Sequence, residues 1–299
     1  MGPGFDCFGI ALSLYNKITL EELVYPDKGL QINVLAGDNE ENFSITSIPT
    51  DESNIVYRAI ELLYNYVGQT PPDLKINIEV NIPIAKGLGS SASVIVGGIL
   101  AANKLLGDPA DEAALLSIAN EIEGHPDNIT PAMLGGFAFS SAEEDGSILY
   151  KKISWCENWK FALCIPDYEL STQISRSVLP KKIDISDAIF NVKRSSMFIE
   201  ALRSQDAELM KYALNDKLHQ PYRSRLITGF DQIKKNLEEL PNVLGTVISG
   251  AGPSILIIYE NNGFDEIKSS LNSVLQETGV KALIKNINID TEGAVITQN

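Results

Sequence analysis

Hydrophobic and polar residues alternate most regularly in residues 74–82. The apolar positions, which alternate with lysine, asparagine and glutamate, are Leu74, Ile76, Ile78, Val80 and Ile82. A period of two predicts a strand with one buried face and one polar face. Such alternation is typical of an antiparallel sheet, because a central parallel strand is apolar on both faces. Pro83 is expected to end the strand because it has no backbone N–H to donate.

A helix is expected before this strand, where apolar side chains recur at helical spacing between Ile55 and Val67. Asp51 or Ser53 can accept hydrogen bonds from the first backbone N–H groups as an N-cap. Gly68 follows the last apolar position and is expected to stop the helix.

Two further helices are expected after the strand. Residues 91–106 are rich in alanine, glycine, valine and isoleucine, which predicts a deeply buried helix. The next helix is expected to begin with Asp108 as N-cap and Pro109 in the first helical position, and to end at Gly124.

The rest of the chain also mixes strands and helices. Strands are expected near residues 18–24, 30–35, 136–139, 148–153, 161–165, 244–248, 255–259 and 282–289, and helices near 187–202, 207–218, 230–240 and 264–276. This order predicts an α+β fold rather than a regular alternation of strand and helix. A boundary near Trp155 would give two domains, residues 1–155 and 156–299.

Composition and charge narrow the classes of function. The 299 residues are 44% hydrophobic, include no apolar run long enough to span a bilayer, and begin with no basic-then-apolar leader. A formal net charge of −15 argues against nucleic acid as a partner. Two histidines exclude a histidine-rich metal site, and three cysteines without metal-ligand spacing indicate reduced thiols in a cytoplasmic protein.

A glycine-rich segment between the alternating strand and the small-residue helix predicts a phosphate site. It consists of Pro83, Ile84, Ala85, Lys86, Gly87, Leu88, Gly89, Ser90, Ser91, Ala92 and Ser93. Glycines allow the backbone to approach a ligand, and the following helix points unpaired N–H groups toward it. A Walker loop is excluded because its lysine follows the glycines. A dinucleotide fingerprint is rejected because the preceding strand alternates.

This segment resembles the P-x-x-x-G-L-G-S-S-A loop of the GHMP kinases, which phosphorylate small molecules. Residues 2–6 with Gly9 resemble the first motif of that family, and residues 249–254 resemble its third, a glycine turn that supports the phosphate loop. Residues 2–6 and 124–128 are most similar to the homoserine-kinase branch. The resemblance covers nearly the whole chain. It implies an N-terminal domain like domain 2 of ribosomal protein S5 and a ferredoxin-like C-terminal domain.

The resemblance also implies ATP and Mg²⁺. One carboxylate at the end of the helix before Gly124 is expected to bind the metal together with a loop serine. Glu123 with Ser91 is the first choice, and Glu121 is the alternative. An acidic chain must then bind an anion through backbone N–H groups, a helix dipole, Mg²⁺ and a few placed cations.

The acceptor implied by the resemblance is L-homoserine, a zwitterion, as in threonine biosynthesis. Its carboxylate requires an arginine fork and its ammonium a carboxylate or amide oxygen. By resemblance, the acceptor pocket is lined by Asp6, His125, Asn128, Thr172, Arg176 and Arg223. Asp6, Glu123 and Arg176 are expected nearest to the reacting groups. Asp6 either accepts the hydroxyl proton or holds the substrate, and no clear general base emerges.

Family members usually carry another strand before residues 2–6, so a chain starting at Met1 is expected to be weakly stable and poorly active. The resemblance is also compatible with a homodimer. Three other functions remain open: another GHMP enzyme such as a mevalonate kinase or diphosphomevalonate decarboxylase, an inactive ligand sensor of the same fold, and, remotely, a dinucleotide-dependent oxidoreductase. A kinase assay with homoserine, mevalonate and a sugar distinguishes among them.

Overall fold

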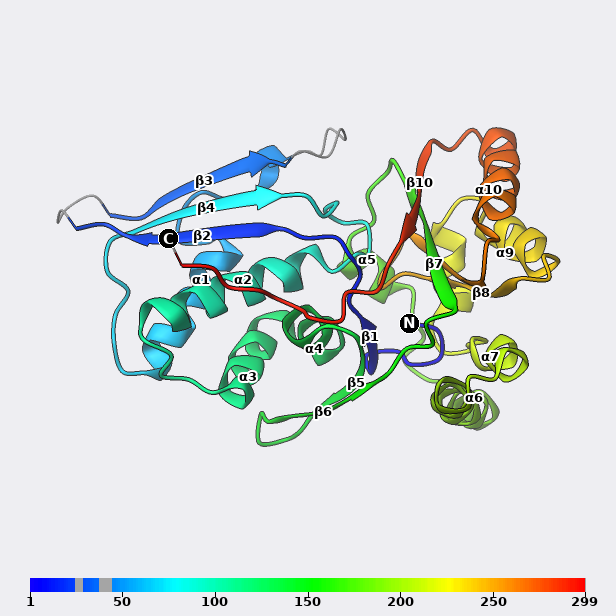
Figure 1. Ribbon diagram of the computed structural model, residues 1–299, viewed down its shortest axis with the longest axis horizontal. Helices are drawn as coiled ribbons and strands as arrows, with labels where there is room; N and C mark the ends of the chain where they lie inside the picture. The colour runs from blue at the N-terminus through cyan, green and yellow to red at the C-terminus, as the bar shows by residue number, and fades with distance from the viewer. Residues whose placement is uncertain (25–28, 38–44, 299) are drawn as a thin grey trace. The chain divides into compact units, whose positions relative to one another are not determined.

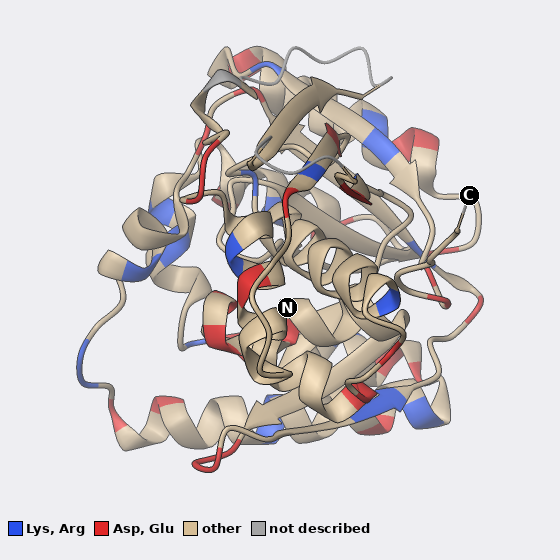
Figure 2. Cartoon of the chain, turned by 90° about the vertical axis from the view of Figure 1, so that its left-hand side faces the viewer, with Lys and Arg blue, Asp and Glu red and all other residues tan. Residues whose placement is uncertain are grey.

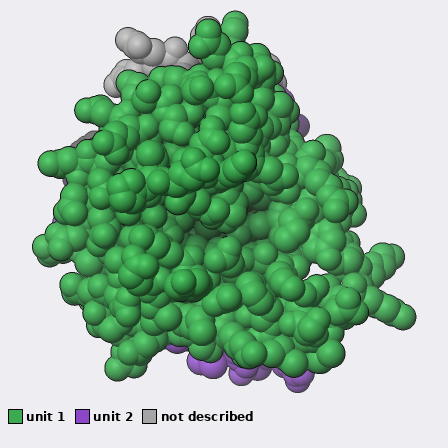
Figure 3. Space-filling view, turned by 90° about the vertical axis from the view of Figure 1, so that its right-hand side faces the viewer, with its two compact units in different colours: residues 1–8, 85–88, 152–289 green, residues 9–84, 89–151, 290–299 purple. Residues whose placement is uncertain are grey.

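The computed structural model describes residues 1–24, 29–37 and 45–298 (Figure 1). The chain divides into two units, which Figure 3 colours separately. Unit 1 comprises residues 1–8, 85–88 and 152–289, and unit 2 comprises residues 9–84, 89–151 and 290–299. Most of unit 2 precedes Lys152 and most of unit 1 follows it, whereas the expected boundary was near Trp155. Three short segments do not follow this simple division. Residues 1–8 and 85–88 belong to unit 1, and residues 290–299 belong to unit 2.

A three-stranded sheet forms one layer of unit 2. Its order is β2–β4–β3, from β2 (Lys17–Glu22), β4 (Leu74–Val80) and β3 (Gln31–Ala36). The expected alternation in β4 is confirmed, since every second side chain from Leu74 to Val80 is buried. The antiparallel expectation is only half right, because β4 is antiparallel to β2 but parallel to β3. The alternation of apolar and polar residues indicates that one face of the strand is buried. It gives no information on whether the neighbouring strand is parallel or antiparallel.

Helices cover the apolar face of this sheet (Figure 1). Helices α1 (Ile55–Tyr66) and α2 (Ser90–Leu105) lie next to the sheet, and α3 (Glu112–Glu123) and α4 (Pro126–Leu134) pack against them. A short 3-10 turn, η1 (Ile45–Ser47), precedes α1. As expected, α2 is deeply buried, and Ile95, Ile99 and Ala102 are inaccessible to solvent. A second sheet has the order β1–β5–β6, from β1 (Phe8–Ile10), β5 (Phe137–Ala142) and β6 (Ile148–Ile153).

Unit 1 is built on a four-stranded antiparallel sheet. Its order is β10–β7–β9–β8, from β10 (Ala282–Ile287), β7 (Trp159–Pro166), β9 (Ile255–Glu260) and β8 (Val243–Ile248). Helices α9 (Phe230–Glu238) and α10 (Phe264–Thr278) share a core with one face. The remaining elements are α5 (Thr172–Ser177), α6 (Ile185–Ser204), α7 (Ala207–Ala213), α8 (Gln220–Arg223) and η2 (Ser224–Leu226). None of the helices in the described part of the chain is long and apolar enough to span a bilayer.

The start of α3 was predicted wrongly. Its N-cap is Asp111, whose side chain accepts from the Ala114 N–H, and not Asp108. The buried amide of Asn103 explains the difference, because it bonds both the N–H and the C=O of Ala110 and so holds that residue outside the helix. Gly124 ends α3 in the left-handed conformation, as expected.

Two other predictions of helix limits were also wrong. The N-cap of α1 is Asn54, which accepts from the Val56 N–H, whereas Asp51 accepts from Ser53 instead. The helix expected over residues 207–218 ends at Ala213, because the Asp216 carboxylate binds the N–H groups that open the next helix. Strand β1 and helices α4, α5 and α8 had no expectation at all.

Candidate active site

The glycine-rich segment adopts a backbone that few side chains allow. Ala85, Gly87 and Gly89 all have positive φ angles, 54°, 72° and 72°. A Cβ on Gly87 would lie 2.1 Å from the Ser249 carbonyl oxygen, so only glycine fits there. The Ser249 hydroxyl also donates to the Gly87 carbonyl at 2.8 Å. The turn at residues 249–254 therefore packs directly against the segment that the sequence paired with it.

Lys86 fixes the same segment from another direction. Its side chain is buried, and its ammonium donates to the carbonyl oxygens of Pro166 (2.9 Å) and Tyr168 (2.7 Å). The Ala85 carbonyl accepts from the Leu170 N–H at 2.9 Å. These carbonyl partners show that Lys86 holds the backbone in place, and the nucleotide contact predicted for it stays a prediction.

The N-terminus of α2 provides the donors that an anion needs. Gly89 is the N-cap and has no side chain to accept from the first N–H groups of the helix. Asn16, which the sequence analysis missed, organises the surrounding residues. Its amide donates to the hydroxyls of Ser93 (2.8 Å) and Ser90 (3.3 Å), and its oxygen accepts from the Asn81 and Ile82 N–H groups. Nothing in the local sequence around Asn16 signals this role.

Ser91 and Glu123 lie together in unit 2, as the metal prediction requires. The Ser91 hydroxyl is 3.0 and 2.9 Å from the two carboxylate oxygens of Glu123, whose side chain is only 10% exposed. Glu121, the alternative, is exposed. No group of three or more acidic, histidine or cysteine ligands is present among the described residues. One carboxylate and one hydroxyl fit Mg²⁺, which usually takes its other ligands from phosphates and water.

His125 lies beside Glu123, and Asn128 lies beside Gly89. The His125 Nδ1 atom makes no hydrogen bond, and it lies 3.9 Å from a Glu123 oxygen and 3.6 Å from an Asp127 oxygen. The Asn128 side-chain oxygen would be 3.8 Å from a Cβ placed on Gly89. Gly9 of the first motif packs on α4, the helix that contains Asp127 and Asn128. A Cβ placed on Gly9 would overlap the Asp127 carbonyl oxygen.

Asp6 and Arg176 form the other predicted group, within unit 1. Arg176 donates through both Nη atoms to the two Asp6 oxygens, at 3.0 and 2.6 Å. Each side chain keeps more than a third of its surface exposed. Both Asp6 oxygens accept from Arg176, and the two roles expected for Asp6, holding the substrate or accepting its proton, stay predictions. Paired opposite charges of this kind suit a ligand that itself carries both charges.

Thr172 and Arg223 lie in the same unit. Thr172 opens α5, the short helix that also carries Arg176, and is exposed. Arg223 is only 3% exposed, and its guanidinium donates to the carbonyls of Ser175 (3.3 Å) and Gly250 (3.1 Å). These contacts tie α5 to the third motif, and the substrate role expected for Arg223 stays a prediction.

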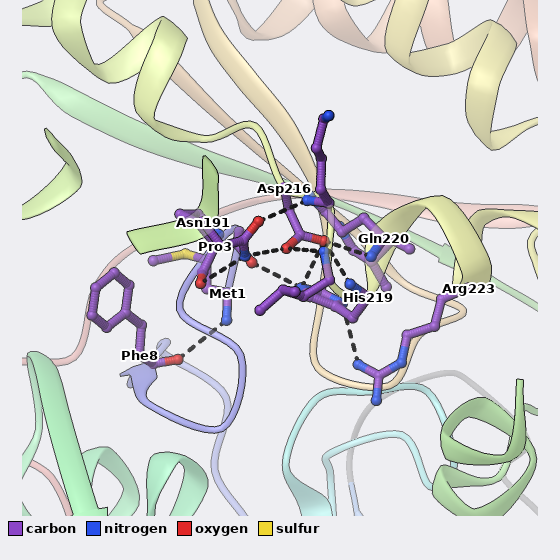
Figure 4. Close-up of polar contacts among 12 residues, drawn as sticks. Met1, Pro3, Phe8, Asn191, Asp216, His219, Gln220 and Arg223 are labelled. Atoms are coloured by element: carbon purple, nitrogen blue, oxygen red, sulfur yellow. Dashed lines mark hydrogen bonds and ion pairs between the residues drawn. The ribbon is translucent and has the colours of Figure 1, made fainter. Parts of the chain in front are cut away.

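A buried polar cluster lies beside Arg223 (Figure 4). The His219 Nε2 atom is 2.8 Å from the Gly2 carbonyl, so Nε2 carries the proton, and Nδ1 faces Arg223 at 3.4 Å. Burial, together with the positive charges of the N-terminus and Arg223, lowers the pKa of His219 to about 4, although Asp216 opposes the shift. Burial would raise the pKa of Asp216, but His219, Asn191 and backbone N–H groups outweigh it and lower that pKa.

The acidic residues are spread over many helices and loops, and basic residues are interspersed with them (Figure 2). The net charge of −15 therefore does not come from one acidic segment. An anion site built from the N–H groups at the start of α2 is compatible with this distribution, because such donors act over short distances.

Two models of one protein family match the chain. A model of the GHMP kinases N terminal domain matches residues 54–136, and a model of the GHMP kinases C terminal matches residues 198–277. The chain is 42% identical over 296 residues to a homoserine kinase of Clostridium botulinum, covering 99% of this chain and 94% of that protein. It is 40% identical over 294 residues to a homoserine kinase of Microchaete diplosiphon, covering 98% and 92%.

Solved structures give the same result. The crystal structure of homoserine kinase from Cytophaga hutchinsonii superposes with a TM-score of 0.85 at 28% identity, covering 98% of this chain and 92% of that one. The mevalonate kinase of L. major, at 17% identity and a TM-score of 0.68, covering 95% of this chain and 89% of that one, shares the fold. The fold and these matches define a two-domain small-molecule kinase. The chain belongs to the GHMP kinase family.

Proposed function

We propose that the chain is a homoserine kinase, which transfers the γ-phosphoryl group of ATP to the side-chain hydroxyl of L-homoserine. The observation that carries the proposal is the Asp6–Arg176 pair, with its two hydrogen bonds of 3.0 and 2.6 Å. In the reaction a bond forms between the hydroxyl oxygen and the γ-phosphorus. The bond from that phosphorus to the β–γ bridging oxygen breaks, ADP leaves, and the hydroxyl proton passes to a phosphate oxygen or to solvent.

In this proposal the pair exchanges partners when the acceptor binds. The Arg176 fork takes the carboxylate of homoserine and Asp6 takes its ammonium, so the ion pair is replaced by two charge-assisted contacts. Asp6 and Arg176 are already ordered by their contact with each other before the acceptor binds. The entropic cost of ordering these two side chains is therefore not added to the cost of binding.

The nucleotide is proposed to bind at residues 83–93. The N–H groups at the start of α2 bind phosphate oxygens, and Ser91 and Glu123 hold Mg²⁺, which neutralises phosphate charge when it is bound. His125, Asn128 and Thr172 are kept as predicted contacts of the acceptor. A homodimer and a cytoplasmic location also stay predictions.

Two truncated acceptors test the zwitterion argument in a kinase assay with ATP and Mg²⁺. 3-Aminopropan-1-ol lacks the carboxylate of homoserine, and 4-hydroxybutyrate lacks the ammonium. Each is expected to lose at least about tenfold in kcat/KM, because a charged partner is left unpaired. Arg176→Met should abolish the preference for homoserine over 3-aminopropan-1-ol, and Asp6→Asn the preference over 4-hydroxybutyrate.

Mevalonate and a sugar serve as control acceptors in the same assay. Faster phosphorylation of mevalonate than of homoserine would replace the proposal with another GHMP kinase. ATP binding without turnover of any acceptor would favour an inactive ligand sensor.

A further inference from the structure

The segment that carries Asp6 is held by buried polar side chains from two other parts of unit 1 (Figure 4). His219 donates to the Gly2 carbonyl at 2.8 Å. Asn191 and Ser195, both on α6, donate to the next carbonyl, that of Pro3, at 3.3 and 3.1 Å. Two consecutive carbonyls, a few residues before Asp6, are thus fixed by three side-chain donors.

Asp216 orients two of these donors, Asn191 and His219. Its side chain is fully buried and accepts from the Asn191 amide at 2.7 Å and from the N–H groups of Leu218, His219 and Gln220. Four donors satisfy a buried carboxylate. The same aspartate therefore fixes the backbone that carries His219 and the amide that binds Pro3.

Phe5 links this cluster to the ion pair. Its ring stacks on the His219 ring with centroids 5.1 Å apart and an interplanar angle of 22°. The guanidinium carbons of Arg176 and Arg223 lie 5.3 and 5.0 Å from the Phe5 ring centroid. Cations at such distances from an aromatic ring are attracted to it. Phe5 is thus in contact with both His219 and Arg176, and Asp6 follows it in the chain.

We propose that His219 is a positioning residue for the acceptor, which fixes Gly2 and Phe5 and thereby sets the Asp6–Arg176 pair. The inference rests on the proposed function for its effect on homoserine. His219 does not touch the substrate in this scheme. It acts through the carbonyl of Gly2 on one side and the ring of Phe5 on the other.

Two substitutions at His219 separate the hydrogen bond from the ring contact. His219→Phe keeps an aromatic ring against Phe5 but loses the donor to Gly2. His219→Gln keeps an N–H donor close to the position of Nε2 but loses the ring. Leu237→Ala is the control, because Leu237 is fully buried in α9 among the core of unit 1 and contributes to stability without contacting residues 2–6.

The expected result is a selective loss of acceptor affinity. In His219→Phe, KM for homoserine should rise about five- to tenfold, while KM for ATP stays within about twofold of the parent value. His219→Gln should recover most of that loss. Leu237→Ala should lower the melting temperature at least as much and leave KM for homoserine unchanged.

Amide hydrogen exchange of residues 2–8 provides a readout that does not need turnover. The Phe8 N–H donates to the Gly4 carbonyl at 2.8 Å, so release of the segment should speed exchange there in His219→Phe and not in Leu237→Ala. Unchanged exchange and unchanged KM for homoserine in His219→Phe would refute the positioning role. Equal rises in KM for homoserine in His219→Phe and Leu237→Ala would show that His219 contributes only to the general stability of the fold. A parent enzyme that does not phosphorylate homoserine would instead refute the proposed function. The exchange experiment would still test whether His219 holds residues 2–8 in place.

Discussion

Gly87 and Gly89 share one backbone conformation but differ in their surroundings, so alanine at the two positions should have different effects. Both have φ of 72°. A Cβ on Gly87 would lie 2.1 Å from the Ser249 oxygen and 2.6 Å from the Gly252 nitrogen. A Cβ on Gly89 would meet only the Asn128 side chain, at 3.8 Å.

These distances set the expected size of each effect. A left-handed conformation costs a residue with a Cβ about 1–2 kcal/mol, and this term applies to both variants. Gly87→Ala must also displace the backbone of residues 249–252, which adds about 1–3 kcal/mol by analogy with an overpacked core. Each kcal/mol corresponds to about 2–4 °C in the melting temperature of a chain of 150–250 residues. Gly87→Ala should therefore be clearly less stable than Gly89→Ala.

Nucleotide affinity should distinguish the variants independently. Gly89→Ala places a methyl group where the phosphate is proposed to approach the first N–H groups of α2, so ATP affinity should fall at least about tenfold, while stability falls only by the left-handed backbone term. Thermal unfolding and titration calorimetry with ATP and Mg²⁺ measure the two quantities on the same preparations. Unchanged ATP affinity in a folded Gly89→Ala protein would refute the phosphate site at α2.

Two further predictions follow from the carboxylates and the buried histidine. Glu123→Gln should raise the Mg²⁺ concentration needed for half-maximal activity about tenfold, whereas Glu121→Gln should leave it unchanged, and equal effects would refute the metal assignment. Because the pKa of His219 is lowered to about 4 in the folded chain, the unfolded chain binds more protons between that value and 6.5. This contribution to stability is complete above pH 6.5 and is lost, by up to about 3 kcal/mol, as the pH falls toward 4. Urea unfolding at pH 7 and pH 5 should show a smaller loss in His219→Gln than in the parent.

Much of the fold followed from periodicity. The alternation in β4, the small-residue content of α2 and the left-handed stop at Gly124 are local signals, and the structure confirms all three. Strand direction could not be predicted in this way, because a side chain on β4 reports what covers its face and not which way β3 runs.

Helix limits failed where a side chain competes with the local capping signal. Asp108 and Pro109 look like a helix start, but the Asn103 amide bonds Ala110 and delays the helix to Glu112. Asp216 similarly interrupts the helical pattern after Ala213 by binding N–H groups further along the chain. In both cases the deciding partner is a polar side chain, and hydrophobic periodicity contains no information about it.

The candidate site was predictable where its motifs are contiguous. The glycine segment, Ser91 and Arg176 each lie within a longer recognisable stretch. Asn16, Asp216 and His219 were missed as site residues because each has at least one partner distant in sequence: Asn16 binds Ser93, Asp216 binds Asn191 and His219 binds Gly2. Only His219 had a usable signal, since it stands four residues before Arg223 and one helical turn brings their side chains together.

The position of Lys86 bears on how an acidic chain can bind a triphosphate. Lys86, within the glycine segment, was expected to contact the nucleotide, and that role stays a prediction. Its ammonium donates to the carbonyls of Pro166 and Tyr168, so its charge stabilises the turn that carries Gly87. In the proposed site the phosphate donors are the N–H groups at the start of α2, whose strength depends on geometry more than on net charge. Such a site needs a fixed backbone, and at residue 87 only glycine allows the observed backbone, because a Cβ there would overlap the Ser249 carbonyl oxygen.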